Sequence, residues 1–169
     1  MRPARAAPRL AVSTACAITA LVLGCSSSPS TGTYTLSFQS VQEAIAVDTV
    51  TVLVFDASTA DAASLCTDLL SRRASAQDLP APLVELPAKT LCELRGGSGS
   101  FDAPFGNVAV LAIAQHAKVD FARGCATQHL DSGSTNVTIE LSLAIDEPGL
   151  SVPATPCASL AQHCANACP

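Results

Sequence analysis

The cysteines are the residues whose number and spacing say most about the chemistry open to this chain. Eight occur among its 169 residues, and the last three stand close together as Cys157-x6-Cys164-x3-Cys168, with His163 beside the second of them. A thiolate can bind zinc, form a disulfide or accept a lipid. Disulfides persist in oxidising compartments, whereas thiols stay reduced in the cytosol. The amino-terminal segment, which indicates the compartment, therefore decides how the cysteines are interpreted.

The first 24 residues have the composition of an export signal. Arg2, Arg5 and Arg9 precede a mostly apolar run over residues 10–23, which contains Cys16. Positive charge followed by a short apolar segment is typical of a signal peptide. The run is shorter than the roughly twenty residues that a membrane-spanning helix needs. We therefore expect residues 1–24 to be removed on export.

The segment Val22-Leu23-Gly24-Cys25 resembles the lipobox of bacterial lipoproteins. Gly24 and Cys25 match that pattern, whereas Leu23 stands where the family usually has a small residue. The resemblance implies cleavage between Gly24 and Cys25, acylation of Cys25 and attachment to the lipid bilayer of the cell envelope. Ser26, in place of the aspartate that retains such proteins at the inner membrane, implies the outer membrane. The alternative is an ordinary secretory signal with an unmodified cysteine.

Serine-rich residues follow the lipobox, and we expect residues 25–32 to be the lipidated cysteine and a flexible tether.

The leader holds three of the nine basic residues and none of the fourteen acidic ones, so the rest carries six basic and fourteen acidic residues, a net charge of minus eight. Binding to nucleic acid needs clustered Lys and Arg. We therefore expect no nucleic-acid partner.

Six cysteines remain beyond residue 25, an even number that predicts three disulfides in an exported protein. They are Cys66, Cys92, Cys125, Cys157, Cys164 and Cys168. We favour pairing Cys66 with Cys125, which would fasten an inserted helix to the loop after a strand. Closing a loop of about sixty residues contributes around 4 kcal/mol in the chain-entropy model. Cys92 would then pair with a cysteine of the tail.

The Pro- and Cys-rich tail, residues 148–169, is interpreted as a separate unit clipped by disulfides. The alternative is a metal site made from Cys157, His163, Cys164 and Cys168. This set lacks the paired spacing of strong zinc motifs, so we assign no metal and no other cofactor.

Catalytic arrangements have little support in the sequence. The only histidines are His116, His129 and His163, which restricts any Ser-His-Asp proposal to three bases. The run Gly96-Gly97-Ser98-Gly99-Ser100 has serine where a nucleophile elbow needs its second glycine, and is better interpreted as a surface turn. Asp56 and Asp120 could be paired acids in space, but scattered surface carboxylates are the better interpretation. We assign no catalytic residue and do not expect an enzyme.

Residues 33–147 have the pattern of an all-β domain. Alternation of apolar and polar residues, or β-branched runs, predict an antiparallel β-sandwich of about seven strands. The predicted strands cover residues 33–38, 47–55, 84–94, 101–105, 108–114, 119–122 and 137–143. Between residues 58 and 73, leucines at helical spacing after a Ser/Thr cap predict one short inserted helix.

The order of these features resembles transthyretin-like and carboxypeptidase-regulatory-like sandwich domains. The resemblance rests on a strand ending in Phe55-Asp56 and on the turn Pro104-Phe105-Gly106 before the run Val108–Ala114. The segment Ala122-Arg123-Gly124-Cys125, together with a helix that bears one cysteine, also resembles uncharacterised envelope lipoproteins. Both resemblances imply an accessory or binding role and carry over no functional residue.

The expected function is thus that of a non-catalytic envelope lipoprotein that binds a protein or glycan, or serves in assembly. An exposed apolar patch or sheet edge would be its working surface. The alternative is a small envelope hydrolase or metal-binding protein that uses the histidines and acidic residues.

Overall fold

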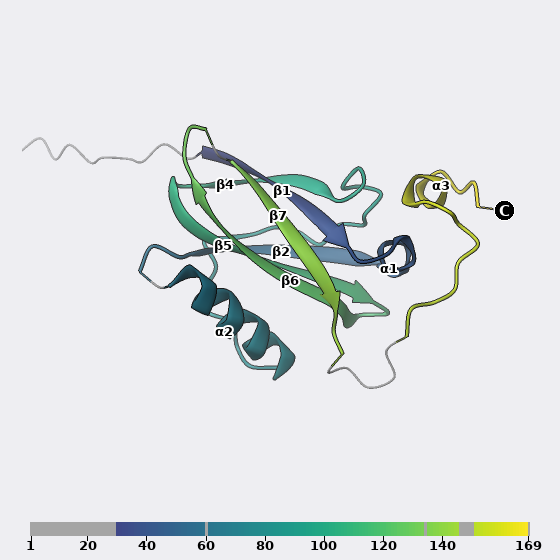
Figure 1. Ribbon diagram of the computed structural model, residues 1–169, viewed down its shortest axis with the longest axis horizontal. Coiled ribbons are helices and arrows are strands. Elements are labelled where there is room, and N and C mark those ends of the chain that lie inside the picture. Colours follow the sequence, from purple (N-terminus) through teal and green to yellow (C-terminus); the bar gives the residue numbers. More distant parts are fainter. Residues whose placement is uncertain (1–29, 60, 134, 146–150, 169) are drawn as a thin grey trace, which may run out of the picture.

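The computed structural model describes residues 30–59, 61–133, 135–145 and 151–168 (Figure 1). Within this part of the chain, strands dominate and the helices are short. The elements are β1 (Ser30–Phe38), α1 (Val41–Ala46), β2 (Thr49–Asp56), α2 (Ala62–Ala74), β3 (Val84–Glu85), β4 (Ser98–Ala103), β5 (Gly106–His116), β6 (Val119–Leu130), β7 (Asn136–Leu143) and α3 (Leu160–Cys164).

The seven strands form one mixed sheet in the order β3-β2-β5-β6-β7-β1-β4. The predicted all-antiparallel arrangement is wrong at one position, because β1 and β7 run parallel, with Thr33 opposite Asn136 and Phe38 opposite Leu141. Alternation of apolar and polar residues indicates that a strand is half-buried, but it does not indicate whether the neighbouring strand is parallel or antiparallel. The sandwich is not confirmed either, since this single sheet curls until it is nearly barrel-shaped and its edge strands β3 and β4 approach each other.

Two interior strands, β2 and β5, are buried on both faces. On the inner face, Val52 and Val110 belong to a large core that also receives residues of β1, β4, β6 and β7. On the outer face, Phe55 and Leu111 pack against Leu69 of α2, which lies along the outside of the sheet (Figure 1). The β-branched and apolar run predicted to be a central strand is β2, which is buried on both faces but lies second from the edge of the sheet, between β3 and β5.

A glycine permits the close approach of β6 and β7. A Cβ built on Gly124 would collide with the backbone carbonyl of Glu140 on β7. The two strands are paired only at Ala122 with Leu143 and at Arg123 with Ser142. This narrow contact joins the two parts of the curled sheet.

Several boundaries differ from those predicted. β1 begins at Ser30, inside the predicted tether, where Gly32 pairs with Phe101 of β4 and lies under its ring. α2 starts at Ala62 behind Asp61, without a side-chain cap, rather than near Ser58. β6 continues to Leu130 because it pairs with β5 throughout, although its second half is too polar to be recognised as a strand.

Gly124→Ala is expected to lower the free energy of unfolding by about 1–3 kcal/mol, as overpacked sites do. The carbonyl in the way belongs to the backbone and has little freedom to move. The measurement is urea unfolding of the oxidised protein. Gly133→Ala is the control, because the nearest atom to its added Cβ is 3.6 Å away. Equal stability of the two variants would contradict this account of the β6–β7 contact.

Candidate functional site

The structure pairs the six predicted cysteines in three disulfides. Cys66 of α2 is bonded to Cys125 of β6, the pair favoured from the sequence, with a Cα–Cα distance of 5.5 Å. Cys92 is bonded to Cys164 of the tail, and Cys157 to Cys168 within it. Gly24 and Cys25, the predicted cleavage and lipidation site, lie outside the described residues.

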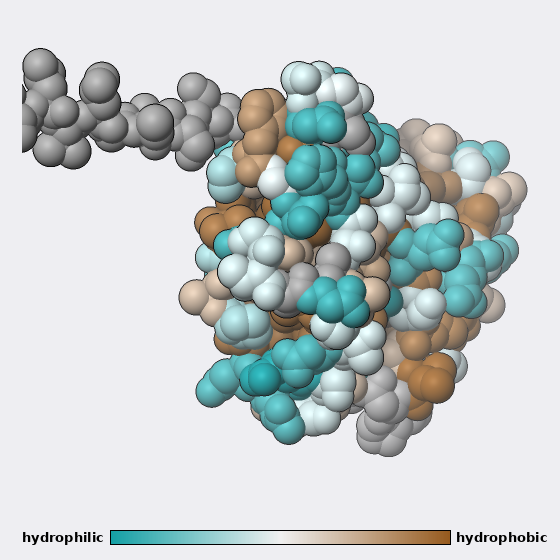
Figure 2. Space-filling view, turned by 60° about the vertical axis from the view of Figure 1, so that its left-hand side comes forward, coloured by the Kyte–Doolittle hydropathy of each residue, from teal (hydrophilic) through white to brown (hydrophobic). Residues whose placement is uncertain are grey.

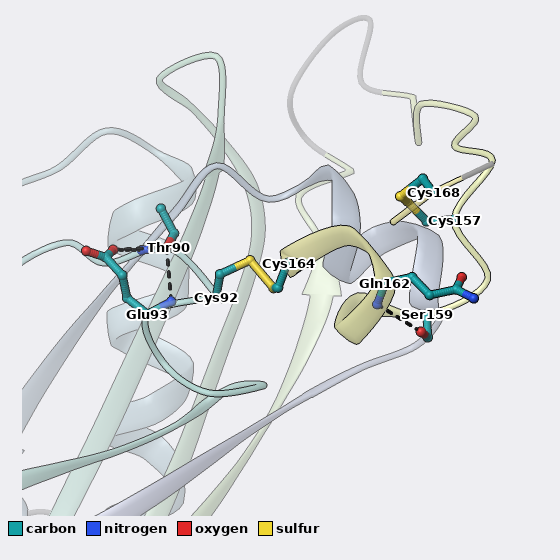
Figure 3. The surroundings of a disulfide bond; sticks show 8 residues. All are labelled: Thr90, Cys92, Glu93, Cys157, Ser159, Gln162, Cys164 and Cys168. Atoms are coloured by element: carbon teal, nitrogen blue, oxygen red, sulfur yellow. Dashed lines mark hydrogen bonds between the residues drawn. A yellow bond between two sulfur atoms is a disulfide. The ribbon is translucent and has the colours of Figure 1, made fainter. Parts of the chain in front are cut away.

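The tail is held against the sheet domain at α3 (Figure 3). Ser159 caps α3 by accepting a hydrogen bond from the Gln162 amide (3.2 Å), and the helix contacts α1. On the other side of the Cys92–Cys164 bond, Thr90 and Glu93 cap a short turn by hydrogen bonds in both directions. The tail is therefore an ordered clip in its described part, as the disulfide interpretation predicts.

The alternative metal site is not assembled as proposed. Cys157, His163 and Cys168 have donor atoms within 4.8 Å of one another, but Cys164 is bonded to Cys92. Cys157 and Cys168 are joined in a disulfide, and a cysteine binds a metal ion only as a free thiolate. In the oxidised protein this cluster offers one free donor, the exposed imidazole of His163.

The three histidines lie in three separate places. His116 Nδ1 lies 3.6 Å from Asp48 Oδ2 and is buried without a hydrogen bond. His129 Nδ1 lies 2.7 Å from Asn107 Oδ1 near the opposite end of β5, and His163 is in the tail. Among the described residues, no serine hydroxyl is hydrogen-bonded to any of them.

Asp56 and Asp120 are not paired, and Asp120, which is buried, is not the surface carboxylate that the sequence favours. Asp56 stands opposite Val108 and Asp120 opposite Gln115, so seven residues of β5, roughly 23 Å of strand, separate the two positions.

Asp120 instead belongs to a buried ionic cluster that sequence reasoning missed. Arg73 of α2 donates two hydrogen bonds to its carboxylate (2.7 and 2.8 Å), Arg123 donates one (2.9 Å) and Gln115 another (3.3 Å). Burial is the largest single influence on the pKa of Asp120 and raises it, but the hydrogen bonds and the Arg73 charge together outweigh burial and lower this pKa. The cluster fastens the end of α2 to the β5–β6 hairpin.

On the face that Figure 2 shows, the apolar side chains do not gather into one large patch. Figure 2 shows hydrophobic residues in small patches separated by hydrophilic ones. The large hydrophobic residues that are exposed come from different parts of the chain, namely Val41, Leu83, Phe105, Val119 and Ile145. A cleft is therefore a better candidate for the site than an apolar patch.

A cleft of about 230 Å³ opens where the two edges of the curled sheet approach each other; we call it the seam cleft. One side is the segment 86–95 and the other is β4. Its lining combines an apolar part, Leu86 and Pro87, with the cations Lys89 and Arg95 and with the polar residues Tyr34, Ser98 and Ser100. The glycine- and serine-rich run interpreted as a surface turn thus contributes to this cleft.

Tyr34 is the buried polar residue of the seam cleft, with an exposed fraction of 3%. Its cross-strand partner is Gly99, where a Cβ would collide with the phenol. The absence of a side chain at Gly99 therefore leaves room for the Tyr34 ring. Burial raises the pKa of Tyr34. Within the described part of the chain, nothing is hydrogen-bonded to its hydroxyl.

A larger groove of about 490 Å³ runs beside the end of α2, but its lining is less suited to a ligand. Its cation, Arg73, is already bound to Asp120, and its other charged residues are Asp78 and Glu85.

No family model, no curated protein and no solved structure matches this chain. Among the helices that the structure describes, none is long and apolar enough to cross a membrane. The candidate site therefore rests on its own geometry.

The Cys66–Cys125 bond is expected to contribute about 4 kcal/mol to the free energy of unfolding, because it closes a loop over a separation of 59 residues. Replacing both cysteines by alanine should remove that contribution in a urea titration. The matched control replaces Cys157 and Cys168, whose separation is only 11 residues and whose bond lies within the tail. A smaller loss in the first variant than in the second would contradict the prediction.

Asp120→Asn is expected to destabilise the protein at neutral pH by about 3 kcal/mol, because it removes the buried carboxylate charge that is paired with Arg73 and Arg123. Since the pKa of Asp120 is lower in the folded chain, the wild-type contribution is present above about pH 4 and is lost as the pH falls through the folded-state pKa. The variant should therefore lose less stability on acidification. Thermal unfolding at several pH values measures this.

The control for that experiment is Asp68→Asn. Asp68 forms a similar 2.6 Å pair with Arg72, but both side chains are substantially exposed. Exposed pairs contribute about 0.2–1 kcal/mol. Equal effects of the two substitutions would show that the Asp120 cluster has no special role.

Proposed function

We propose that this chain is an envelope lipoprotein, anchored by acylated Cys25, whose folded domain binds a ligand at the seam cleft and does no catalysis. The observation that carries the proposal is the complete pairing of the six cysteines beyond the lipobox. Such pairing suits an exported, oxidising compartment. An exported chain with Gly24-Cys25 at the end of its leader is a substrate for lipidation.

The position of β1 supports a domain held close to the bilayer. Cys25 is five residues from Ser30, so at most about 18 Å of extended chain separates the lipid from the first strand. The seam cleft lies beside the middle of β1, since Ser98, Gly99 and Ser100 are opposite Thr35, Tyr34 and Thr33.

The arrangement of polar residues favours binding over hydrolysis. The histidines are apart from one another, and the nearest approach of a histidine to an acid, 3.6 Å between His116 and Asp48, has no hydroxyl nucleophile bonded to it. In contrast, two cations and the Tyr34 side chain line the seam cleft. A partner of this protein would be an envelope component, protein or glycan, that presents a complementary group.

Cys25→Ser is expected to abolish the incorporation of labelled palmitate when the full chain is produced in a bacterium. The variant should also leave the membrane fraction, because each buried methylene of an acyl chain contributes about 0.8 kcal/mol to membrane binding. Cys16→Ser, inside the leader, is the matched control and should keep the label. Label that persists in Cys25→Ser, or is absent from the wild type, would refute the anchor.

A further inference from the structure

Some of the basic residues that the structure describes form ion pairs and others do not. Two of those without an ion pair line the seam cleft. Arg72 is paired with Asp68, and Arg73 and Arg123 with Asp120. Of the other basic residues that the structure describes, Lys118 lies at the β5–β6 turn, whereas Lys89 and Arg95 both line the seam cleft.

Neither cation of the seam cleft forms an ion pair with a described residue. Glu93 is the carboxylate that lines the cleft with them, but its Oε2 accepts hydrogen bonds from the Thr90 amide (2.7 Å) and hydroxyl (2.9 Å). These hydrogen bonds, more than the Lys89 charge, lower the pKa of Glu93. Glu93 is the one carboxylate in the lining of the cleft, so its two cations leave the cleft with a net positive charge in a domain with excess negative charge, which indicates an anionic ligand.

Arg95 is held in its place by the backbone. Its φ is +47°, a left-handed conformation that is uncommon for a residue with a side chain. The turn is fixed by the Thr90–Glu93 cap, by the Cys92–Cys164 disulfide and by the hydrogen bond from the Leu36 amide to the Gly97 carbonyl (2.8 Å). Backbone strain of this kind persists where the surroundings enforce it, and is common at binding sites.

The rest of the lining is chemically complementary to a polyhydroxylated ring. Tyr34, which is 97% buried, has a hydroxyl without a partner in the described part of the chain, and Ser98 and Ser100 of β4 also line the cleft. Leu86 and Pro87 supply an apolar surface. The volume of about 230 Å³ is below the roughly 300–1,000 Å³ of pockets for drug-sized ligands, so it suits one sugar-sized group.

We propose that the seam cleft binds an acidic sugar residue of an envelope glycan, with its carboxylate toward Lys89 and Arg95 and its hydroxyl groups toward Tyr34 and the serines. This inference rests on the proposed binding function and specifies its ligand. A bare phosphate would leave the apolar lining unused, and a peptide carboxylate would leave the Tyr34 hydroxyl unused. The acidic sugar uses all three parts of the lining.

The chain carries its own reporter for a binding experiment. Tyr34 is its only tyrosine and it has no tryptophan, so its intrinsic fluorescence reports on the seam cleft. The full acylated protein in detergent is titrated with D-glucuronate, and with D-glucose, acetate, inorganic phosphate and a dipeptide in parallel. We expect saturable binding of glucuronate that weakens as salt is added, and none of glucose. Equal binding of phosphate, acetate or the dipeptide would overturn the sugar assignment.

Charge-removing variants locate the binding. Lys89→Gln and Arg95→Gln should each weaken glucuronate binding about tenfold or more, the effect of losing a hydrogen bond to a charged group. Lys118→Gln removes the same charge away from the cleft and should bind as the wild type does. Unfolding curves verify that each variant is folded. Unchanged affinity in the folded Lys89 and Arg95 variants would refute the site.

The outcome separates this inference from the proposed function. If glucuronate does not bind, but Cys25 still takes the palmitate label and crosslinking in the envelope captures a protein through the cleft, the ligand assignment alone is wrong. If Cys25 takes no label while glucuronate binds, the anchor is wrong and the ligand assignment stands.

Discussion

The burial of β5 on both faces is the constraint on which the rest of the structure depends. From Val108 to Ala114 this strand has no polar side chain, so apolar side chains project from both of its faces. One face can be covered by a helix, and α2 does so. The other face needs a second cover, and the sheet itself supplies it by curling until β1, β4 and β7 lie over the inner core. Burial of about 25 cal/mol per Å² of apolar surface drives both arrangements.

Two covalent or ionic links hold α2 in this role. The Cys66–Cys125 disulfide joins the first half of the helix to β6, and the Arg73–Asp120 pair joins its end to the β5–β6 hairpin. The hydrophobic contact of α2 is small, since it rests on few buried residues such as Leu69. A helix with so little apolar surface needs such links to stay on the sheet.

The strands were predictable because they depend on local patterns, and the presence of three disulfides was predictable because six cysteines are an even number. Alternation in Val137–Leu143 and the β-branched run in β2 describe burial directly. The parallel β1–β7 pair was not predictable, because the direction of a neighbour depends on the path of the whole chain. Three short helical turns had a signal that was missed: Ser40-x-x-Glu43, Thr90-x-x-Glu93 and Ser159-x-x-Gln162 each place a Glu or Gln three residues after a capping Ser or Thr.

The seam cleft shows why the candidate site is harder to predict than the fold. Lys89 and Arg95 are separated from Tyr34 by more than fifty residues, and they meet only because the sheet curls and brings its two edges together. In sequence, each appears as an isolated surface charge. The tail adds to this geometry, since Cys164 is bonded to Cys92, three residues before Arg95, and Leu160 lies near the inner core. A cysteine-rich tail interpreted as a clip thus has a second effect, which is to keep one side of the seam cleft in place.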